Sequence, residues 1–129
     1  MASQSDVRRI ALSLPETEEG TDRFAFSVRA GARTKGFAWV WMERTTPKQL
    51  RVPNPDVLAV RVANLVEKDA LLEVDPTRFF TEPHYNGFPA VLVRLPVIEE
   101  DELEDLIIDA WRCQAPRALV RQYDARATS

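Results

Sequence analysis

FAFSVRAGARTKGFAWVWM, residues 24–42, is the stretch that decides the fold of this chain. It holds two runs of alternating residues around a glycine-containing connection, and alternating side chains of a strand point to opposite faces. The stretch therefore predicts a β-hairpin. One face of the first run carries Phe24, Phe26 and Val28. In the second run we expect Phe37, Trp39 and Trp41 to share one face and to anchor a core. Stacking of bases on an exposed sheet is the alternative role for the two tryptophans.

Helical periodicity marks both ends of the chain. Apolar residues at positions i, i+3, i+4 and i+7 predict a helix over residues 7–14, which Pro15 ends. The same spacing over residues 103–111 predicts the last long helix. Four acids at residues 99–102 occupy its first turn, where they oppose the positive end of the helix dipole. A short terminal helix over residues 118–123 follows.

The region after the hairpin predicts strands and one helix. A short strand at residues 49–52 precedes a stronger one at residues 57–62, and prolines punctuate the region around them. Asn64 and Glu67 then form a capping-box pattern, in which each side chain satisfies a free amide at the start of a helix. We expect this helix to run to about residue 74.

Two further strands are expected at residues 79–81 and 90–95. The loop between them contains Asn86-Gly87, a pair typical of hairpin turns. The predicted order is α-β-β-β-α-β-β-α, with hairpins and short connections throughout. Such an order favours an antiparallel sheet, so we predict one α+β domain over residues 1–129, with about five strands and helices packed on one face.

Charge is distributed unevenly along the chain, although the net charge is only −3. Residues 23–61 carry eight basic and two acidic side chains, a net of +6, whereas residues 64–111 carry three basic and twelve acidic ones, a net of −9. The segment from residue 112 onward has a net charge of +3, from four basic and one acidic residue. An anionic partner such as DNA would therefore meet the first hairpin or the tail. The candidate phosphate-contacting residues are Arg29, Arg33, Lys35, Arg117 and Arg121. The alternative is that the charged residues of the hairpin only form a solvated tip and contact no phosphates.

The loop at residues 82–89 is the second candidate site. His84, Tyr85 and Asn86 supply hydrogen-bonding groups there, and Arg94 follows on the next strand. Ligand-binding residues are often found on loops that a rigid scaffold positions, so a protein or a small molecule is the partner expected for this loop. The alternative is a structural turn that packs its two aromatic side chains against the sheet.

Residue types exclude several kinds of chemistry. His84 is the only histidine, which removes sites that need two, including most catalytic zinc sites. None of the four glycines forms a phosphate-binding loop or a dinucleotide fingerprint. Cys113 is the only cysteine, and we expect it to be a small buried side chain rather than a reactive one. We interpret the acids of residues 99–109 as a solvated helix face. The expected protein is non-enzymatic, without cofactor or metal.

The sequence also indicates a cellular location. Its first residues show no basic segment before an apolar core, as a secretory signal would, and no apolar run reaches the roughly 18 residues of a membrane span. A single cysteine permits no intramolecular disulfide, which is typical of a reducing compartment. We therefore expect a cytoplasmic protein that has no membrane partner, and take a monomer as the default.

The chain resembles the MmcQ/YjbR family. The specific part is FFTEPHYNGFPAVLVRL at residues 79–95, supported by shorter matches. These matches are Leu14-Pro15-Glu16-Thr17, Glu19-Gly20, Phe37-Ala38, Ala110-Trp111 and Ala115-Pro116. The resemblance implies a compact α+β fold similar to frataxin-like and secretion-chaperone-like folds. It also implies DNA binding by analogy with a double-wing motif, and it supplies no catalytic residues. Metal binding of the frataxin kind is not implied, because the acids of this chain lie on its last helix rather than its first.

Overall fold

A computed structural model describes residues 1–44, 46 and 50–128 of the chain. Its six-stranded antiparallel sheet has the order β1-β2-β3-β4-β6-β5 over these residues. In chain order the elements are α1 (Gln4–Leu12), β1 (Thr17–Glu19), β2 (Ala25–Ala30), β3 (Arg33–Glu43), β4 (Val52–Arg61), α2 (Leu65–Val74), β5 (Phe79–Phe80), the 3-10 turn η1 (Pro83–Tyr85), β6 (Ala90–Arg94), the 3-10 turn η2 (Leu95–Val97), α3 (Glu100–Gln114) and α4 (Arg117–Thr128).

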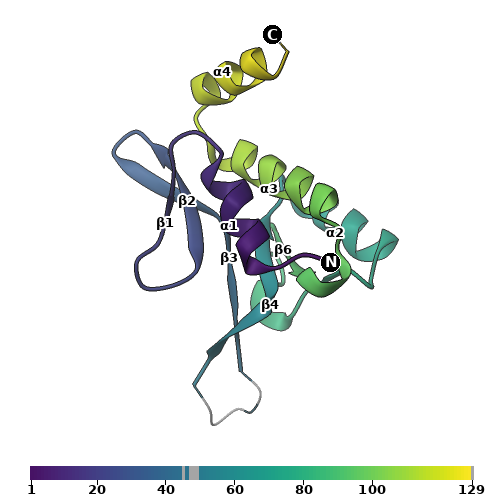
Figure 1. Cartoon of the computed structure of the whole chain (residues 1–129). Coiled ribbons are helices and arrows are strands. Elements are labelled where there is room, and N and C mark those ends of the chain that lie inside the picture. The colour runs from purple at the N-terminus through teal and green to yellow at the C-terminus, as the bar shows by residue number, and fades with distance from the viewer. Residues whose placement is uncertain (45, 47–49, 129) are drawn as a thin grey trace.

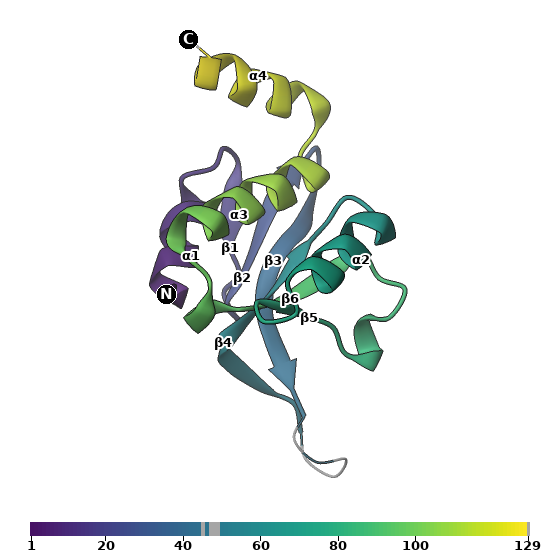
Figure 2. The same cartoon turned by 90° about the vertical axis from the view of Figure 1, so that its right-hand side faces the viewer.

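The sheet has one covered face and one open face. Helices α1, α2 and α3 lie against the same face, as Figures 1 and 2 show, and the core lies between them and the strands. This confirms the predicted α+β class and the placement of the helices. We call the opposite side the open face, because only the loop between β5 and β6 reaches over it among the described elements. No helix within the described ranges is long and apolar enough to cross a membrane.

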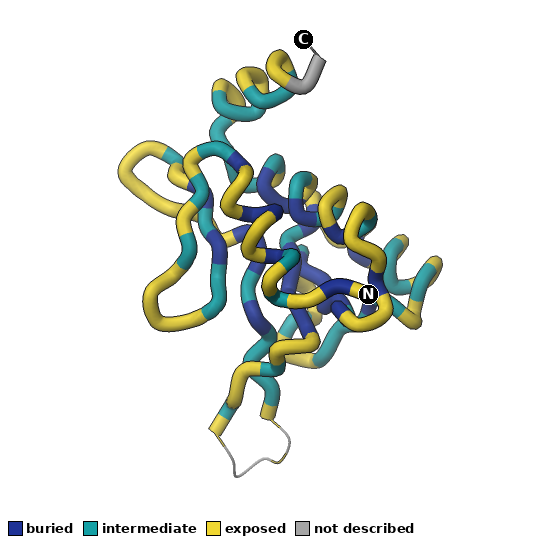
Figure 3. Tube along the Cα trace, viewed as in Figure 1, coloured by how far each residue is buried: buried dark blue, intermediate teal, exposed yellow. Residues whose placement is uncertain are grey.

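Helix α3 supplies the centre of the core. Leu103, Ile107 and Trp111 are fully buried on the face that the sequence pattern predicted. The Trp111 indole also donates a hydrogen bond of 3.0 Å to the carbonyl of Pro15, just after α1. Figure 3 shows the buried residues concentrated along this helix and the strands behind it. The hydrogen bond between Trp111 and Pro15 therefore joins α3 to the segment just after α1.

A β-bulge at Phe37 separates aromatic residues that the sequence grouped together. Phe26 pairs with Ala38 while Ser27 pairs with Gly36, which leaves Phe37 without a partner in the ladder. A bulge inserts one residue and so interrupts the alternation of side chains. Phe37 and Ala38 are consequently both buried in the core under the helices. The expectation that Phe37 shares a face with Trp39 and Trp41 is wrong.

The strands on either side of the predicted hairpin also differ from expectation. β1 forms within the acidic connection before residue 24, and Thr17 pairs with Val28. β4 is one strand in place of two separate ones, and Gln49, part of the short strand expected at 49–52, lies outside the described residues. Pro55 lies where the register shifts between Val40 and Trp41, and Pro53 pairs with Met42 in the part of β4 that extends beyond its pairing with β6. β5 is limited to two residues.

Helix α4 is longer than the predicted terminal helix. It spans Arg117–Thr128 and extends beyond the sheet, as Figure 1 shows. Its contact with the body runs through Tyr123, whose ring lies 5.1 Å from that of Trp111. Arg112 of α3 lies over the same tyrosine ring at 5.4 Å and also forms an ion pair with Asp124. These contacts attach α4 to the end of α3.

We expect Trp111→Phe to lower the free energy of unfolding by about 1–3 kcal/mol, because it removes the indole hydrogen bond to the Pro15 carbonyl and opens space in the core. Urea denaturation would measure the loss. Trp41→Phe is the matched control, since the Trp41 indole nitrogen has no hydrogen-bond partner among the described residues. Equal losses in the two variants would contradict the role given to the Trp111 hydrogen bond.

Candidate functional site

The open face carries a cluster of aromatic side chains, which we call the aromatic cluster. Its members are Trp39, Trp41, Phe80, Tyr85 and Phe88. They surround a small buried group formed by Val57, Ala59 and Leu92. The rings of Trp41 and Phe80 meet edge to face at 5.5 Å, which is a favourable arrangement for an aromatic pair. The two tryptophans are only partly buried, so the expected core role is correct in part.

The loop at residues 82–89 places Tyr85 over this face. The Trp39 indole nitrogen donates a hydrogen bond of 3.0 Å to the Tyr85 hydroxyl oxygen. Gly87 has a φ of 77°, a conformation that glycine adopts without strain and that the Asn-Gly pattern indicated. The turn forms a wide connection between the two paired strands, since η1 lies within it.

Lys68 of α2 holds the loop from the other side. The residue is 3% exposed, and its ammonium donates to the carbonyls of Tyr85 at 2.6 Å and Phe88 at 2.9 Å. Burial lowers the pKa of Lys68, and nearby Asp69 partly offsets that effect. A buried charge is costly unless its donors are satisfied, so these two carbonyls make the position tenable. Lys68 therefore ties the loop to α2, which lies against the other face of the sheet.

Two adjoining hollows open beside Tyr85. One, of about 290 Å³, is lined by Trp39, His84, Tyr85 and Phe88. The other, of about 240 Å³, is lined by Arg23, Trp39, Met42, Arg51, His84 and Tyr85. They share three ring-bearing side chains, so together they form one site with an apolar end and a cationic end. Arg51 donates to the Met42 carbonyl at 2.9 Å, whereas Arg23 forms no ion pair or hydrogen bond with the described residues.

Several polar atoms around this site are buried without an internal partner. They are the Trp41 Nε1 and Arg61 Nε atoms, the Thr81 hydroxyl and one Glu82 carboxylate oxygen, as judged from the residues that the structure describes. Native proteins satisfy most buried polar groups, either internally or through bound water. All four belong to the open face or to the start of the loop.

Of the four residues predicted for this site, His84 and Tyr85 line the hollows. Asn86 is exposed at the turn and lines neither. Arg94 is engaged elsewhere, because its guanidinium lies 4.1 Å over the Phe80 ring and donates to the carbonyls of Pro76 and Thr77. Sequence reasoning missed Arg23 and Arg51, which reach the site from just before β2 and just before β4. Only their membership of the +6 segment pointed to them.

The predicted basic residues gather at one end of the molecule, but not on one surface. Gln114 donates to the Gly36 carbonyl at 3.0 Å, which brings the start of α4 beside the β2–β3 hairpin (Figures 1 and 2). Arg33 and Lys35 are exposed and share one strand face. Arg29 pairs in register with Thr34, so its side chain points to the opposite face of the hairpin from Arg33 and Lys35. There the Arg29 guanidinium lies 3.8 Å from the Glu18 carboxylate. Arg117 and Arg121 are exposed on α4.

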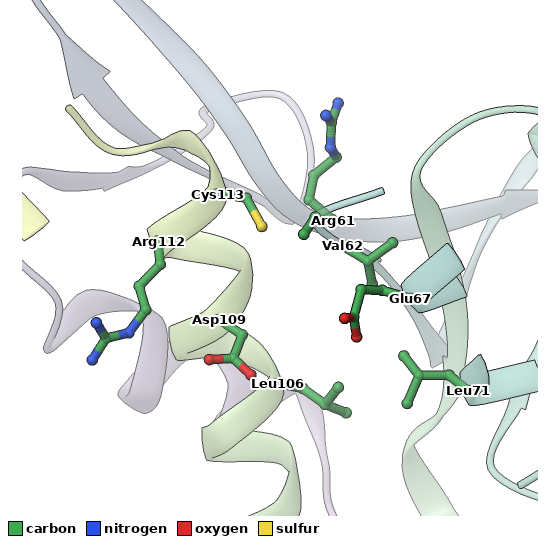
Figure 4. A pocket seen from close by; sticks show the side chains of 9 residues that line it. Arg61, Val62, Glu67, Leu71, Leu106, Asp109, Arg112 and Cys113 are labelled. Atoms are coloured by element: carbon green, nitrogen blue, oxygen red, sulfur yellow. The ribbon is translucent and has the colours of Figure 1, made fainter. Parts of the chain in front are cut away.

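A larger cleft, of about 490 Å³, lies between α2 and α3, away from the open face (Figure 4). Cys113 is exposed at this cleft, so the expectation of a buried cysteine is wrong. Its position at the end of α3 turns it from the sheet, and desolvation by the cleft walls raises the pKa of its thiol. Cys113 and His84 line different cavities. No group of three histidine, cysteine or acidic side chains suited to a metal occurs in the part of the chain that the structure describes.

The profile of the YjbR family matches residues 12–113. The chain belongs to the YjbR family. Uncharacterized proteins of Mycobacterium bovis and Mycobacterium tuberculosis are each 38% identical to this YjbR chain over 133 residues, covering 98% of it and 99% of the relative. A crystal structure of a Deinococcus radiodurans protein, with a domain named DUF419, has a TM-score of 0.65 at 18% identity. It covers 86% of this chain and 77% of its own, and at that identity it shows the shared fold alone.

We expect Lys68→Met to loosen the loop of this YjbR chain, because the substitution keeps the length of the side chain but removes both hydrogen bonds from the ammonium to the carbonyls of Tyr85 and Phe88. Amide hydrogen exchange over residues 82–89 should become faster, while exchange within α3 changes little. Glu73→Met, at an exposed position of the same helix, is the matched control and should leave the loop as protected as before. Unchanged protection of the loop in Lys68→Met would contradict the tether.

Proposed function

We propose that this YjbR-family chain is a non-enzymatic binding module, and that its open face takes a planar anion of the nucleotide type, either free or within single-stranded DNA. The observation that supports this is the pair of adjoining hollows that share Trp39, His84 and Tyr85. Their combined size suits one ring system with an attached anionic group, since ligand sites typically measure about 300–1,000 Å³.

The two ends of the site match the two parts of such a ligand. A base offers a flat π-face, and stacking on an aromatic side chain contributes about 1–3 kcal/mol per base. The guanidinium groups of Arg23 and Arg51 stand at the other end, where a phosphate would accept charge-assisted hydrogen bonds. Tyr85 is fixed by its bond to Trp39, so the stacking surface exists before the ligand arrives.

The same site supports a binding role rather than catalysis. Acid–base catalysis requires a positioned proton-transfer group, commonly with a second group that orients or complements it. His84 lines both hollows, and neither is lined by a carboxylate or a cysteine among the described residues. An exposed histidine among rings and guanidiniums is suited to recognising an anion.

Titration of the isotope-labelled protein with thymidine monophosphate and with a short single-stranded oligothymidylate tests the proposal. We expect shifts of the Trp39 indole signal, and a loss of affinity of about tenfold in Arg23→Gln, equivalent to about 1.4 kcal/mol. Arg121→Gln on α4 is the matched control and should bind as the unmodified chain does. Binding of the oligonucleotide alone would identify the polymer as the ligand. Flat titrations with both probes would overturn the proposal.

Duplex DNA at the basic end is a second candidate, and the Gln114–Gly36 hydrogen bond favours it by bringing α4 beside the hairpin. Exposed Arg33 and Lys35 would then contact one stretch of phosphate backbone, with Arg117 and Arg121 on the next. Contacts of this kind carry little sequence information and weaken steeply with salt.

For this candidate we expect Lys35→Gln to weaken duplex binding and to reduce the slope of log affinity against log salt by about 1, the effect of one lost phosphate contact. Arg29→Gln should change that slope less, because Arg29 points to the other face beside Glu18. Fluorescence anisotropy at several salt concentrations would measure both. An unchanged slope in Lys35→Gln would remove the hairpin from any duplex interface.

A further inference from the structure

The cleft between α2 and α3 has the size of a ligand site. It shares no lining residue with the two hollows of the open face. It measures about 490 Å³. Its floor is apolar and is formed by Val62, Leu71 and Leu106, the last two packed against the main core. Floors of this kind accept a hydrophobic ligand body, while a few polar groups fix its orientation.

The polar groups that point into the cleft are acidic. Glu67 of α2 and Asp109 of α3 come from facing helices, and Figure 4 shows both carboxylates directed toward the space between them. Burial raises the pKa of Asp109, and the charges of Asp105 and Glu67 raise it further. Arg112 opposes this shift without cancelling it. Asp109 and Glu67 therefore interact across the cleft as like charges.

The two arginines that border the cleft, Arg61 and Arg112, form no salt bridge with these acids among the described residues. The Arg61 guanidinium lies 4.9 Å over the Phe88 ring, on the open-face side. The Arg112 guanidinium forms its ion pair with Asp124. Figure 4 shows the Arg61 guanidinium directed away from the carboxylates. Neither Glu67 nor Asp109 forms a salt bridge within the described ranges of the chain.

We infer that this cleft binds a small organic cation with an apolar body, of the arylalkylammonium class. The ammonium would lie between Glu67 and Asp109 and donate to both carboxylates, and the apolar body would cover Leu71 and Leu106. Charge complementarity selects this occupant, because the two carboxylates directed into the cleft attract a cation and repel an anion, whereas a neutral ligand gains nothing from them. The site is separate from the open face and does not depend on the function proposed for that face.

Phenethylamine is a suitable probe, with 2-phenylethanol as its neutral and phenylacetate as its anionic counterpart. We expect phenethylamine to shift the amide signals of Glu67 and Asp109 and to slow alkylation of Cys113 at the rim. Phenylethanol should bind at least about tenfold more weakly, and phenylacetate should not bind. Equal binding of the amine and the alcohol would overturn the inference, since the carboxylates would then contribute nothing.

Asp109→Asn and Glu67→Gln should each weaken phenethylamine binding by about tenfold, whereas Glu104→Gln, an exposed acid of α3 that does not line the cleft, should leave it unchanged. Both variants remove charge without removing core volume. A cooperative thermal unfolding transition in each variant would check that it still folds. Affinity should also fall as the pH drops through the raised pKa of Asp109, with Glu67, Asp105, Arg61, Arg112 and Cys113 as the neighbouring titratable groups. A loss of the same size in Glu104→Gln would show a general charge effect and would refute the site.

Discussion

The bulge at Phe37 is the constraint on which the two faces of this sheet depend. One unpaired residue in β3 allows Phe37 and Ala38 to enter the core together under α3. Alternation then resumes, so that Trp39 and Trp41 emerge on the side without helices. Without the extra residue, all three aromatics would lie on a single face, since a shift of one residue moves every following side chain to the other side of a sheet. The bulge thus divides the aromatic side chains of β3 between the core and the open face.

Local patterns predicted the elements that depend on local physics. The apolar spacing of α3 and the cap at Asn64 both hold, and Asn64 accepts a hydrogen bond of 2.9 Å from the Glu67 amide. The short strand β1 could not be predicted in the same way, because it consists of polar residues that are ordered by pairing with β2. The bulge was missed as well, because Gly36, a residue type that often marks a bulge within a strand, was assigned to the connection of the hairpin.

The candidate site was predictable only where its residues adjoin in sequence. His84 and Tyr85 stood out because they share one unusual loop, whereas Arg23 and Arg51 come from distant segments that the fold brings to the same hollow. Arg94 shows the opposite error: it lies near in sequence and on the same face, but its guanidinium is held against Phe80 and two carbonyls. Cys113 was misplaced because residue type alone says nothing about which side of a helix end faces solvent.

Lys68 also affects the conformational entropy of the loop that covers part of the open face. A loop of eight residues that must be ordered by its ligand loses conformational entropy at that moment, and this loss is subtracted from the affinity. Here the loop is already fastened to α2 by a buried ammonium, through the carbonyls of Tyr85 and Phe88. The entropy is lost during folding instead. A ligand of this surface would therefore meet a loop that is already ordered, and its affinity would not be reduced by the cost of ordering that loop.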